Sequence, residues 1–403
     1  SISHGSRMGK SGKQQRNQLK PPHRRRSFRC AQLGEEEDSY PNNNIERDPL
    51  DSSTGSIDVV EDDVDDDVGC GKDEGENAES SLADIPSKFI LYQQSVQLPK
   101  GDISYMLKFF MMYVGGRLPF HLQEDFCGTA FLSTEWLSRD ARRTAVGLDL
   151  DIEALNWCLE NNVKKAGADV FSRIFLFHGN VLQPFGATLI NLGPEDLTRN
   201  IRLKGIVNVS EKGLLQICPS VSDNNCLEDN ISLPARDIVC AFNYSCCCIQ
   251  RRGDLIIYFK HVLDALSKSG GIFVMDLYGG TSSECNLKLQ KRFPNFMYVW
   301  EQDDFDIIQR RTRISLHYHL QQPRKRLRHA FTYTWRLWSL PEIKDCMGDA
   351  GFQSVHFWIR GMPDTEPGRI TEGFGCGREV KYEEVSSFQQ QGAWNAYIVG
   401  VVN

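Results

Sequence analysis

Residues 122–150 read LQEDFCGTAFLSTEWLSRDARRTAVGLDL, and this stretch predicts the fold. Residues 122–124 end a strand, the small residues of 127–130 form a turn, and 130–137 continue as a helix with apolar positions on one face. Residues 144–148 are a short buried strand that ends on Asp149. In an open α/β sheet, ligands bind in the crevice beyond the carboxyl ends of the strands. The turn and Asp149 therefore predict a binding site.

The chemistry of this stretch points to a cofactor that carries a nucleoside. A turn of small residues lets the backbone approach a ligand closely. An acid at the end of the second strand, here Asp149, can accept hydrogen bonds from both hydroxyls of a ribose.

The stretch resembles the first motif of the class I S-adenosylmethionine-dependent methyltransferases, which runs roughly acid-x-G-x-G-x-G. It is more similar to a branch of that superfamily with the forms EDFCGTA…GLDLD and FNYS…DLYGG. Two glycine positions of the general motif are Phe126 and Ala130 here. The resemblance extends from about residue 88 to the C-terminus, except for one insertion. It implies a Rossmann-like α/β fold: a seven-stranded sheet with a C-terminal antiparallel strand pair and a small antiparallel cap inserted after strand 5.

The same resemblance implies S-adenosyl-L-methionine as the cofactor. Glu124 matches the motif acid, Asp149 the ribose-binding acid, and Asn180 a residue at the adenine edge. Asn180 has a second interpretation, a turn residue that bonds its own backbone. The predicted cofactor-binding residues are Glu124, Phe126, Cys127, Gly128, Thr129, Asp149, Leu150, Asn180, Val181 and Phe242.

Three residues at the ends of later strands are the predicted catalytic residues. Asn243 and Tyr244 follow a fourth strand at 238–242, and Asp276 lies near the end of a fifth at 272–277. An Asn can accept from a nucleophile, and a Tyr ring can face a developing positive charge. Asp276 is predicted as a general base or a substrate anchor. The alternative for Asn243 is a cap on the next helix.

The chain divides into a tail and one domain. Residues 1–84 are predicted to be a disordered tail, basic at first and then acidic, because blocks of like charge and low hydrophobicity cannot build a core. Residues 1–80 hold 11 Lys/Arg and 18 Asp/Glu, so they carry the whole net charge of −7. A basic tract of this kind also suits a nuclear-localisation signal or a nucleic-acid arm.

Residues 85–403 are predicted to be the methyltransferase domain. Residues 187–234 interrupt it as a loop insertion, with a lid or a partner-binding segment as the alternatives. Residues 296–338 read as three antiparallel strands that would cap the substrate side. In the resembling family the segment that begins at 88 packs over the cofactor, so Tyr92 and Gln93 are either lid contacts or ordinary helix residues.

Composition limits the remaining functions. No run of 18 apolar residues exists, so no membrane partner is predicted. The 13 cysteines are odd in number and irregularly spaced, which favours a reducing compartment and no structural zinc. We expect a cytoplasmic or nuclear location rather than an organelle.

Three functions are weighed. A nicotinamide-dependent oxidoreductase would need G-x-G-x-x-G, which 127–132 lack. A methyltransferase is favoured, and a catalytically inactive methyltransferase fold that serves as a binding or scaffold module is the alternative. The acceptor is open among small molecules, proteins and RNA. Residues 81–403 carry no net charge, which disfavours broad nucleic-acid binding. The sequence does not predict the oligomeric state.

Overall fold

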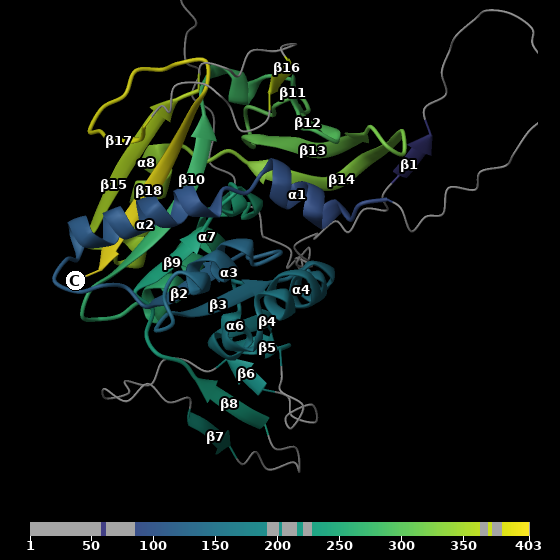
Figure 1. Ribbon diagram of the computed structural model, residues 1–403. Coiled ribbons are helices and arrows are strands. Elements are labelled where there is room, and N and C mark those ends of the chain that lie inside the picture. Colours follow the sequence, from purple (N-terminus) through teal and green to yellow (C-terminus); the bar gives the residue numbers. More distant parts are fainter. Residues whose placement is uncertain are drawn as a thin grey trace, which may run out of the picture. The chain divides into compact units, whose positions relative to one another are not determined.

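The structure is a computed structural model that describes residues 58–61, 85–191, 201–203, 216–220, 228–362, 370–372 and 381–402. The described strands form a twelve-stranded sheet, which we call the main sheet, and a six-stranded one, which we call the cap sheet. Figure 1 shows both sheets, with helices packed against the main sheet.

Seven neighbouring strands of the main sheet are the seven that the sequence predicts. Their order is β15-β18-β10-β9-β2-β3-β4. Strands β10, β9, β2, β3 and β4 run parallel, and β18 is antiparallel to both β10 and β15. This α/β arrangement with a C-terminal antiparallel pair confirms the predicted fold class. The bounds are β2 His121–Asp125, β3 Thr144–Asp149, β4 Ile174–His178, β9 Ile238–Ala241, β10 Gly271–Gly279, β15 Ser354–Gly361 and β18 Trp394–Val402.

The main sheet extends beyond these seven strands at both edges. Strand β17 (Glu383–Glu384) pairs with β15. Beyond β4 come β5 (Thr188–Leu189), β6 (Ile201–Leu203), β8 (Glu228–Ser232) and β7 (Gln216–Ser220). The segment 187–234, predicted as a loop insertion, therefore contains strands. The physical reason is that β4 would otherwise expose unpaired backbone N–H and C=O groups, and β5 pairs with it antiparallel.

Helices cover both faces of the main sheet. On one face lie α2 (Pro99–Tyr113), α3 (Phe131–Ser138), α4 (Ile152–Cys158) and α6 (Ala168–Arg173); on the other lie α7 (Arg252–Ala265) and α8 (Leu340–Ala350). Because side chains alternate along a strand, Ile272 and Val274 of β10 enter the first core, and Phe273 and Met275 the second. The helix predicted over 152–165 is interrupted by a π-helical turn at Leu159–Val163, before α5 (Lys164–Ala166).

The cap sheet contains the three strands predicted within 296–338: β12 (Phe296–Gln302), β13 (Arg311–Leu320) and β14 (Lys325–Arg336). Strands β11 (Leu287–Arg292) and β16 (Ile370–Glu372) extend it on one side, and β1 (Asp58–Glu61) pairs antiparallel with β14 on the other. Strand β1 belongs to the segment predicted as a disordered tail, so four residues of that segment are ordered as a strand. The rest of the segment lies outside the described residues.

Helix α1 (Lys88–Ser95) packs on the cap sheet, as Figure 1 also shows. The Ser95 hydroxyl lies 3.3 Å from the Tyr318 hydroxyl, and the Tyr92 ring lies 5.0 Å from that of Phe331. The Lys88 ammonium of α1 also pairs with the Glu153 carboxylate of α4 at 3.0 Å, so α1 joins the cap sheet to a helix of the main sheet. In the part of the chain that the structure describes, no helix combines the length and apolarity that crossing a membrane requires.

Candidate active site

A tight turn follows β2 and keeps a left-handed backbone at three positions. The φ angles are 56° at Phe126, 51° at Gly128 and 45° at Ala130. Phe126 and Ala130 are the residues that replace glycines of the general motif, so they adopt the conformation that glycine takes at little cost. The Cys127 N–H donates to the Leu148 carbonyl at 3.2 Å, which ties the turn to β3.

Asp149 at the end of β3 holds the same turn. Its Oδ2 accepts from the Gly128 N–H at 2.6 Å, and its Oδ1 accepts from the Asp151 N–H at 2.8 Å. Burial raises the pKa of Asp149 to about 6, against the opposing effect of these two donors. The neighbouring Leu150 side chain is 38% exposed. A carboxylate and an exposed apolar side chain therefore stand side by side at this strand end.

Glu124 points into the start of α3. Its buried carboxylate accepts from both the N–H (3.0 Å) and the hydroxyl (2.5 Å) of Ser133, a partner that sequence reasoning missed. Burial raises the pKa of Glu124 to about 8, although both bonds to Ser133 act in the other direction. The predicted motif acid thus fixes the helix that follows the turn.

The other predicted cofactor residues are mostly buried. Cys127 and Thr129 are 1% and 3% exposed, and the Thr129 hydroxyl donates to Gln97 Oε1 at 3.1 Å. Val181 and Phe242 are each 7% exposed. Asn180 Oδ1 accepts from the Leu182 N–H at 2.9 Å, which is the turn arrangement weighed as its second interpretation.

A second left-handed turn follows β9 and brings the three predicted catalytic residues together. Asp276 Oδ2 accepts from the Asn243 N–H at 3.0 Å, and Asp276 Oδ1 accepts from the Tyr244 N–H at 2.8 Å. The φ angles of Asn243 and Tyr244 are 59° and 60°. Burial raises the pKa of Asp276 to about 8. Tyr244 is the N-cap of the 3₁₀ helix Ser245–Cys248 and no side chain caps it, so Asn243 does not cap it.

Tyr244 connects this turn to β18 and to the cap sheet. Its hydroxyl donates to Asn395 Oδ1 at 3.0 Å. Its ring lies 4.8 Å from that of Tyr278, 5.8 Å from Trp335 and 6.5 Å from Trp300. Sequence reasoning missed these partners, which come from distant strands.

Tyr92 of α1 lies near both turns. Burial raises its pKa, and the charges of Tyr318, Asp276 and Asp149 raise it further. The next residue, Gln93, is buried, and its Nε2 has no hydrogen-bond partner. The lid contact predicted for these two residues stays a prediction, and their positions are compatible with it.

Further polar residues that the sequence did not single out lie beside Asp276. The Tyr397 hydroxyl donates to Asp102 Oδ1 at 2.5 Å, and the ring of Tyr382 lies 4.4 Å from that of Tyr397. The Arg360 guanidinium sits 4.6 Å from the centre of the Tyr382 ring. A cation directly after the apolar run 357–359 of β15 was the available signal for Arg360.

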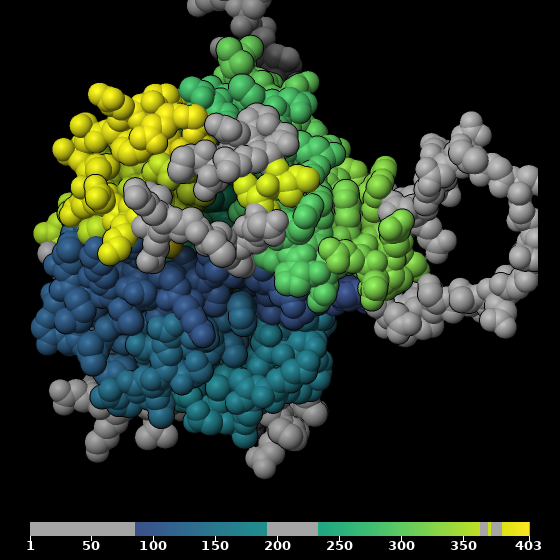
Figure 2. Space-filling model, turned by 45° about the horizontal axis from the view of Figure 1, so that its top comes forward, coloured from purple at the N-terminus to yellow at the C-terminus, as the bar shows by residue number. Residues whose placement is uncertain are grey.

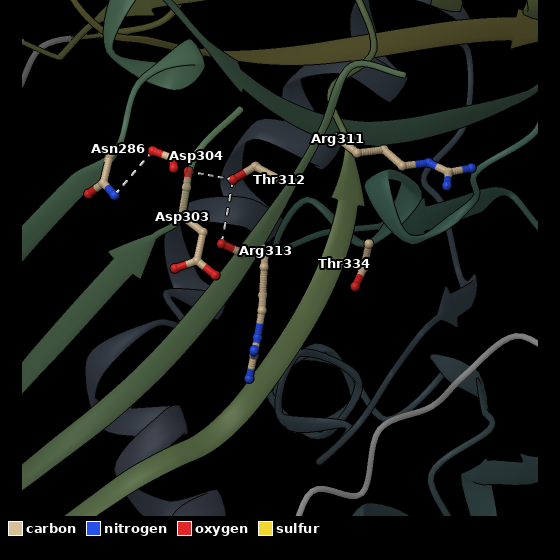
Figure 3. A pocket seen from close by; sticks show the side chains of 7 residues that line it. All are labelled: Asn286, Asp303, Asp304, Arg311, Thr312, Arg313 and Thr334. Carbon is tan, nitrogen blue, oxygen red and sulfur yellow. Dashed lines mark hydrogen bonds between the residues drawn. The ribbon is translucent and has the colours of Figure 1, made fainter. Parts of the chain in front are cut away.

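Figure 3 shows a cavity in the cap sheet that is separate from these turns. It has a volume of about 420 Å³ and is lined by Asn286, Asp303, Asp304, Arg311, Thr312, Arg313 and Thr334. None of these is a predicted site residue. Among the described residues no group of three or more His, Cys, Asp or Glu could hold a metal ion.

Neither known protein families nor curated protein sequences give a significant match to this chain. Solved structures do match. An S-adenosylmethionine-dependent methyltransferase from Clostridium acetobutylicum is 14% identical, with 77% of this chain and 96% of that one covered and a TM-score of 0.43. The CcbJ methyltransferase from Streptomyces caelestis is 12% identical, with 79% of this chain and 97% of that one covered and a TM-score of 0.46. The amino pentose methyltransferase CalS10 from Micromonospora echinaspora was solved with S-adenosylmethionine bound. It is 10% identical, with 80% of this chain and 99% of that one covered and a TM-score of 0.44.

Proposed function

We propose that this chain is an S-adenosylmethionine-dependent methyltransferase. The observation that carries the proposal is the pair of carboxylate-held turns at the carboxyl ends of neighbouring parallel strands. Gly128 and Asp149 form one, and Asn243, Tyr244 and Asp276 form the other. Both lie at the carboxyl ends of parallel strands, where open α/β sheets bind ligands, and the antiparallel β18 pairs with β10 at that side of the sheet.

The residues around the first turn fit the nucleoside part of the cofactor. A Cβ at Gly128 would meet no atom within 4 Å, so open space adjoins the turn. The Asp149 carboxylate keeps lone pairs that can accept from ribose hydroxyls besides its two backbone donors. Leu150 offers an apolar surface to a base, and Gln93 brings an unused buried donor.

The bound cofactor supplies a methyl group that its sulfonium already activates, so the protein's task is placement of the acceptor. We assign that task to the second turn. Asp276 fixes the backbone of Asn243 and Tyr244 through two N–H donors, which leaves the Asn243 side chain to accept from the acceptor's N–H or O–H. Asp276 thus acts by positioning, and the general-base role is its alternative.

Calorimetric titration with S-adenosylmethionine and S-adenosylhomocysteine tests the proposal. We expect micromolar binding, weakened at least tenfold by Asp149→Ala, which equals about 1.4 kcal/mol. The matched control is Asp151→Ala. Asp151 caps α4 by accepting from Glu153 and Ala154 N–H groups, so its loss costs about 1 kcal/mol of stability but leaves binding within threefold. Absence of binding by the intact chain would contradict the proposal.

A labelled-methyl assay separates the enzyme from the scaffold alternative. Pools of small molecules, proteins and RNA serve as acceptors, because the acceptor class is open. Cofactor binding followed by transfer to one pool supports an enzyme. Cofactor binding without transfer to any pool favours the catalytically inactive scaffold.

A further inference from the structure

The acceptor side of the candidate site contains two cations from different sheets. Arg360 lies on β15 of the main sheet, and Lys291 lies on β11 of the cap sheet. Neither belongs to the predicted cofactor or catalytic residues.

The register of three neighbouring strands places Arg360 on the face that carries Asp276. Arg360 is opposite Asn395, and Asn395 is opposite Tyr278. Side chains directly opposite each other in antiparallel strands share a face, and Asp276, two residues before Tyr278, shares it too. Two inter-strand spacings put Arg360 on the order of 10 Å from Tyr278. That distance suits a binding group for the remote part of an acceptor.

The register of the cap sheet places Lys291 toward the same region. Lys291 is opposite Tyr298, so these two residues share a face with Trp300. The Trp300 ring contacts those of Tyr278 (5.9 Å) and Tyr244 (6.5 Å). Lys291 therefore lies on the cap-sheet face that packs against the second turn.

The two cations interact, and in the part of the chain that the structure describes neither forms an ion pair with a carboxylate. Burial lowers the pKa of Lys291, and the positive charge of Arg360 lowers it further. Arg360 Nε is buried without a hydrogen-bond partner. Burial raises the pKa of Asp102 to about 6, and the positive charge of Arg360 opposes this rise. The Oδ1 atom of Asp102 accepts from the Tyr397 hydroxyl. Two neighbouring cations with an unused donor favour an anion between them.

We propose that the methyl acceptor carries an anionic group, a carboxylate or a phosphate, that binds between Arg360 of the main sheet and Lys291 of the cap sheet. That the bound molecule is a methyl acceptor rests on the proposed methyltransferase function. The binding of an anion between the two cations does not depend on that function. Figure 2 shows yellow C-terminal residues and green residues of the cap sheet on the same face of the molecule.

Titration with inorganic phosphate and with acetate, at ionic strength held constant with chloride, tests the site by the thermal unfolding midpoint and by calorimetry. Wild type binds at least one of the two anions, and the preferred anion distinguishes a phosphate from a carboxylate. Arg360→Gln and Lys291→Gln each weaken that binding at least tenfold. Arg292→Gln, which removes a cation next to Lys291 on the opposite face, leaves it unchanged.

Two further readouts keep the outcomes separate. S-adenosylhomocysteine binding is measured on the same variants and stays within twofold of wild type, so failure of the cofactor assignment is seen independently. Competitive amine labelling against pH reports Lys291 directly, and Arg360→Gln raises its pKa. Absence of binding to both anions, equal weakening by Arg292→Gln, or an unchanged Lys291 pKa would each overturn the proposal.

Discussion

The turn after β2 and the turn after β9 share one construction but differ in how much of the chain they involve. Each has a left-handed backbone at non-glycine residues, and each is held by an aspartate that accepts from backbone N–H groups. One carboxylate oxygen of Asp149 accepts from the first turn, and the other accepts from the nearby Asp151 N–H. Both carboxylate oxygens of Asp276 accept from the second turn.

The two turns also differ in the side chains that surround them. Burial raises the pKa of Asp276 to about 8 and that of Asp149 to about 6. The aromatic rings of Tyr278, Trp300 and Trp335 surround Tyr244, whereas Leu150 beside the first turn is exposed. Under the proposed function, the first turn binds the cofactor and the second turn positions the acceptor.

The largest expected effect comes from removing the two aspartates in turn. Asp276→Ala leaves two backbone donors in dry surroundings and should lower the free energy of unfolding by about 2–4 kcal/mol. Asp149→Ala should cost about 1–2 kcal/mol, because water can replace its carboxylate. Urea denaturation measures both. Equal losses would contradict the difference in solvation between the turns.

Two glycine substitutions near the first turn should have different effects, one mainly on stability and the other mainly on cofactor binding. A Cβ at Gly147 would lie 2.7 Å from Leu176 Cδ2 and 2.9 Å from Cys127 Sγ. Gly147→Ala should therefore cost about 1–3 kcal/mol by overpacking. Gly128→Ala meets open space, so it should cost only about 1 kcal/mol of backbone strain while it weakens cofactor binding more than Gly147→Ala does. If Gly147→Ala weakened cofactor binding more than Gly128→Ala, the assignment of the first turn to cofactor binding would be contradicted.

The pH dependence of stability should distinguish the two aspartates. Each has a folded-state pKa above its unfolded value, so the folded chain holds the proton more tightly, and stability falls as pH rises between the two values. For Asp149 this window ends near pH 6, and for Asp276 near pH 8. Asp276→Asn should flatten the fall between pH 6 and 8, by up to about 1.4 kcal/mol per pH unit. Asp149→Asn should flatten it only below pH 6, as unfolding curves at each pH would show.

The smallest effect concerns the strain at the first turn. Ala130 has a φ of 45°, a conformation that costs an L-residue roughly 1 kcal/mol. Ala130→Gly should recover about 0.5 kcal/mol of stability after the greater chain entropy of glycine is counted. Ala187→Gly, at an ordinary φ of −71°, is the control and should only destabilise. A loss at both positions would show that the turn is not strained.

The first turn could be predicted from the sequence because its partners are close in the chain. Gly128 and Asp149 are separated by 21 residues, and the strand–turn–helix pattern between them is unambiguous. The second turn was predicted as three separate residues, but its connections were not. Tyr244 and Asn395 are 151 residues apart, and no local pattern links them.

The same reason explains the other differences. Strand β5 pairs with β4 because an edge needs a partner, but two residues are too short to show a period. Strand β1 pairs with β14 across more than 260 residues, with Asp58 opposite Arg328 and Glu61 opposite Lys325. Blocks of like charge predicted disorder there, and no local pattern in the sequence indicates a partner strand so far along the chain.

A crystal structure with S-adenosylhomocysteine bound tests the central claim most directly. We expect the ribose hydroxyls at the Asp149 carboxylate, the base against Leu150, and the sulfur directed toward Asn243 and Asp276. A nucleoside bound elsewhere on the chain, or a sulfur directed away from the second turn, would contradict the claim that the two turns form one site.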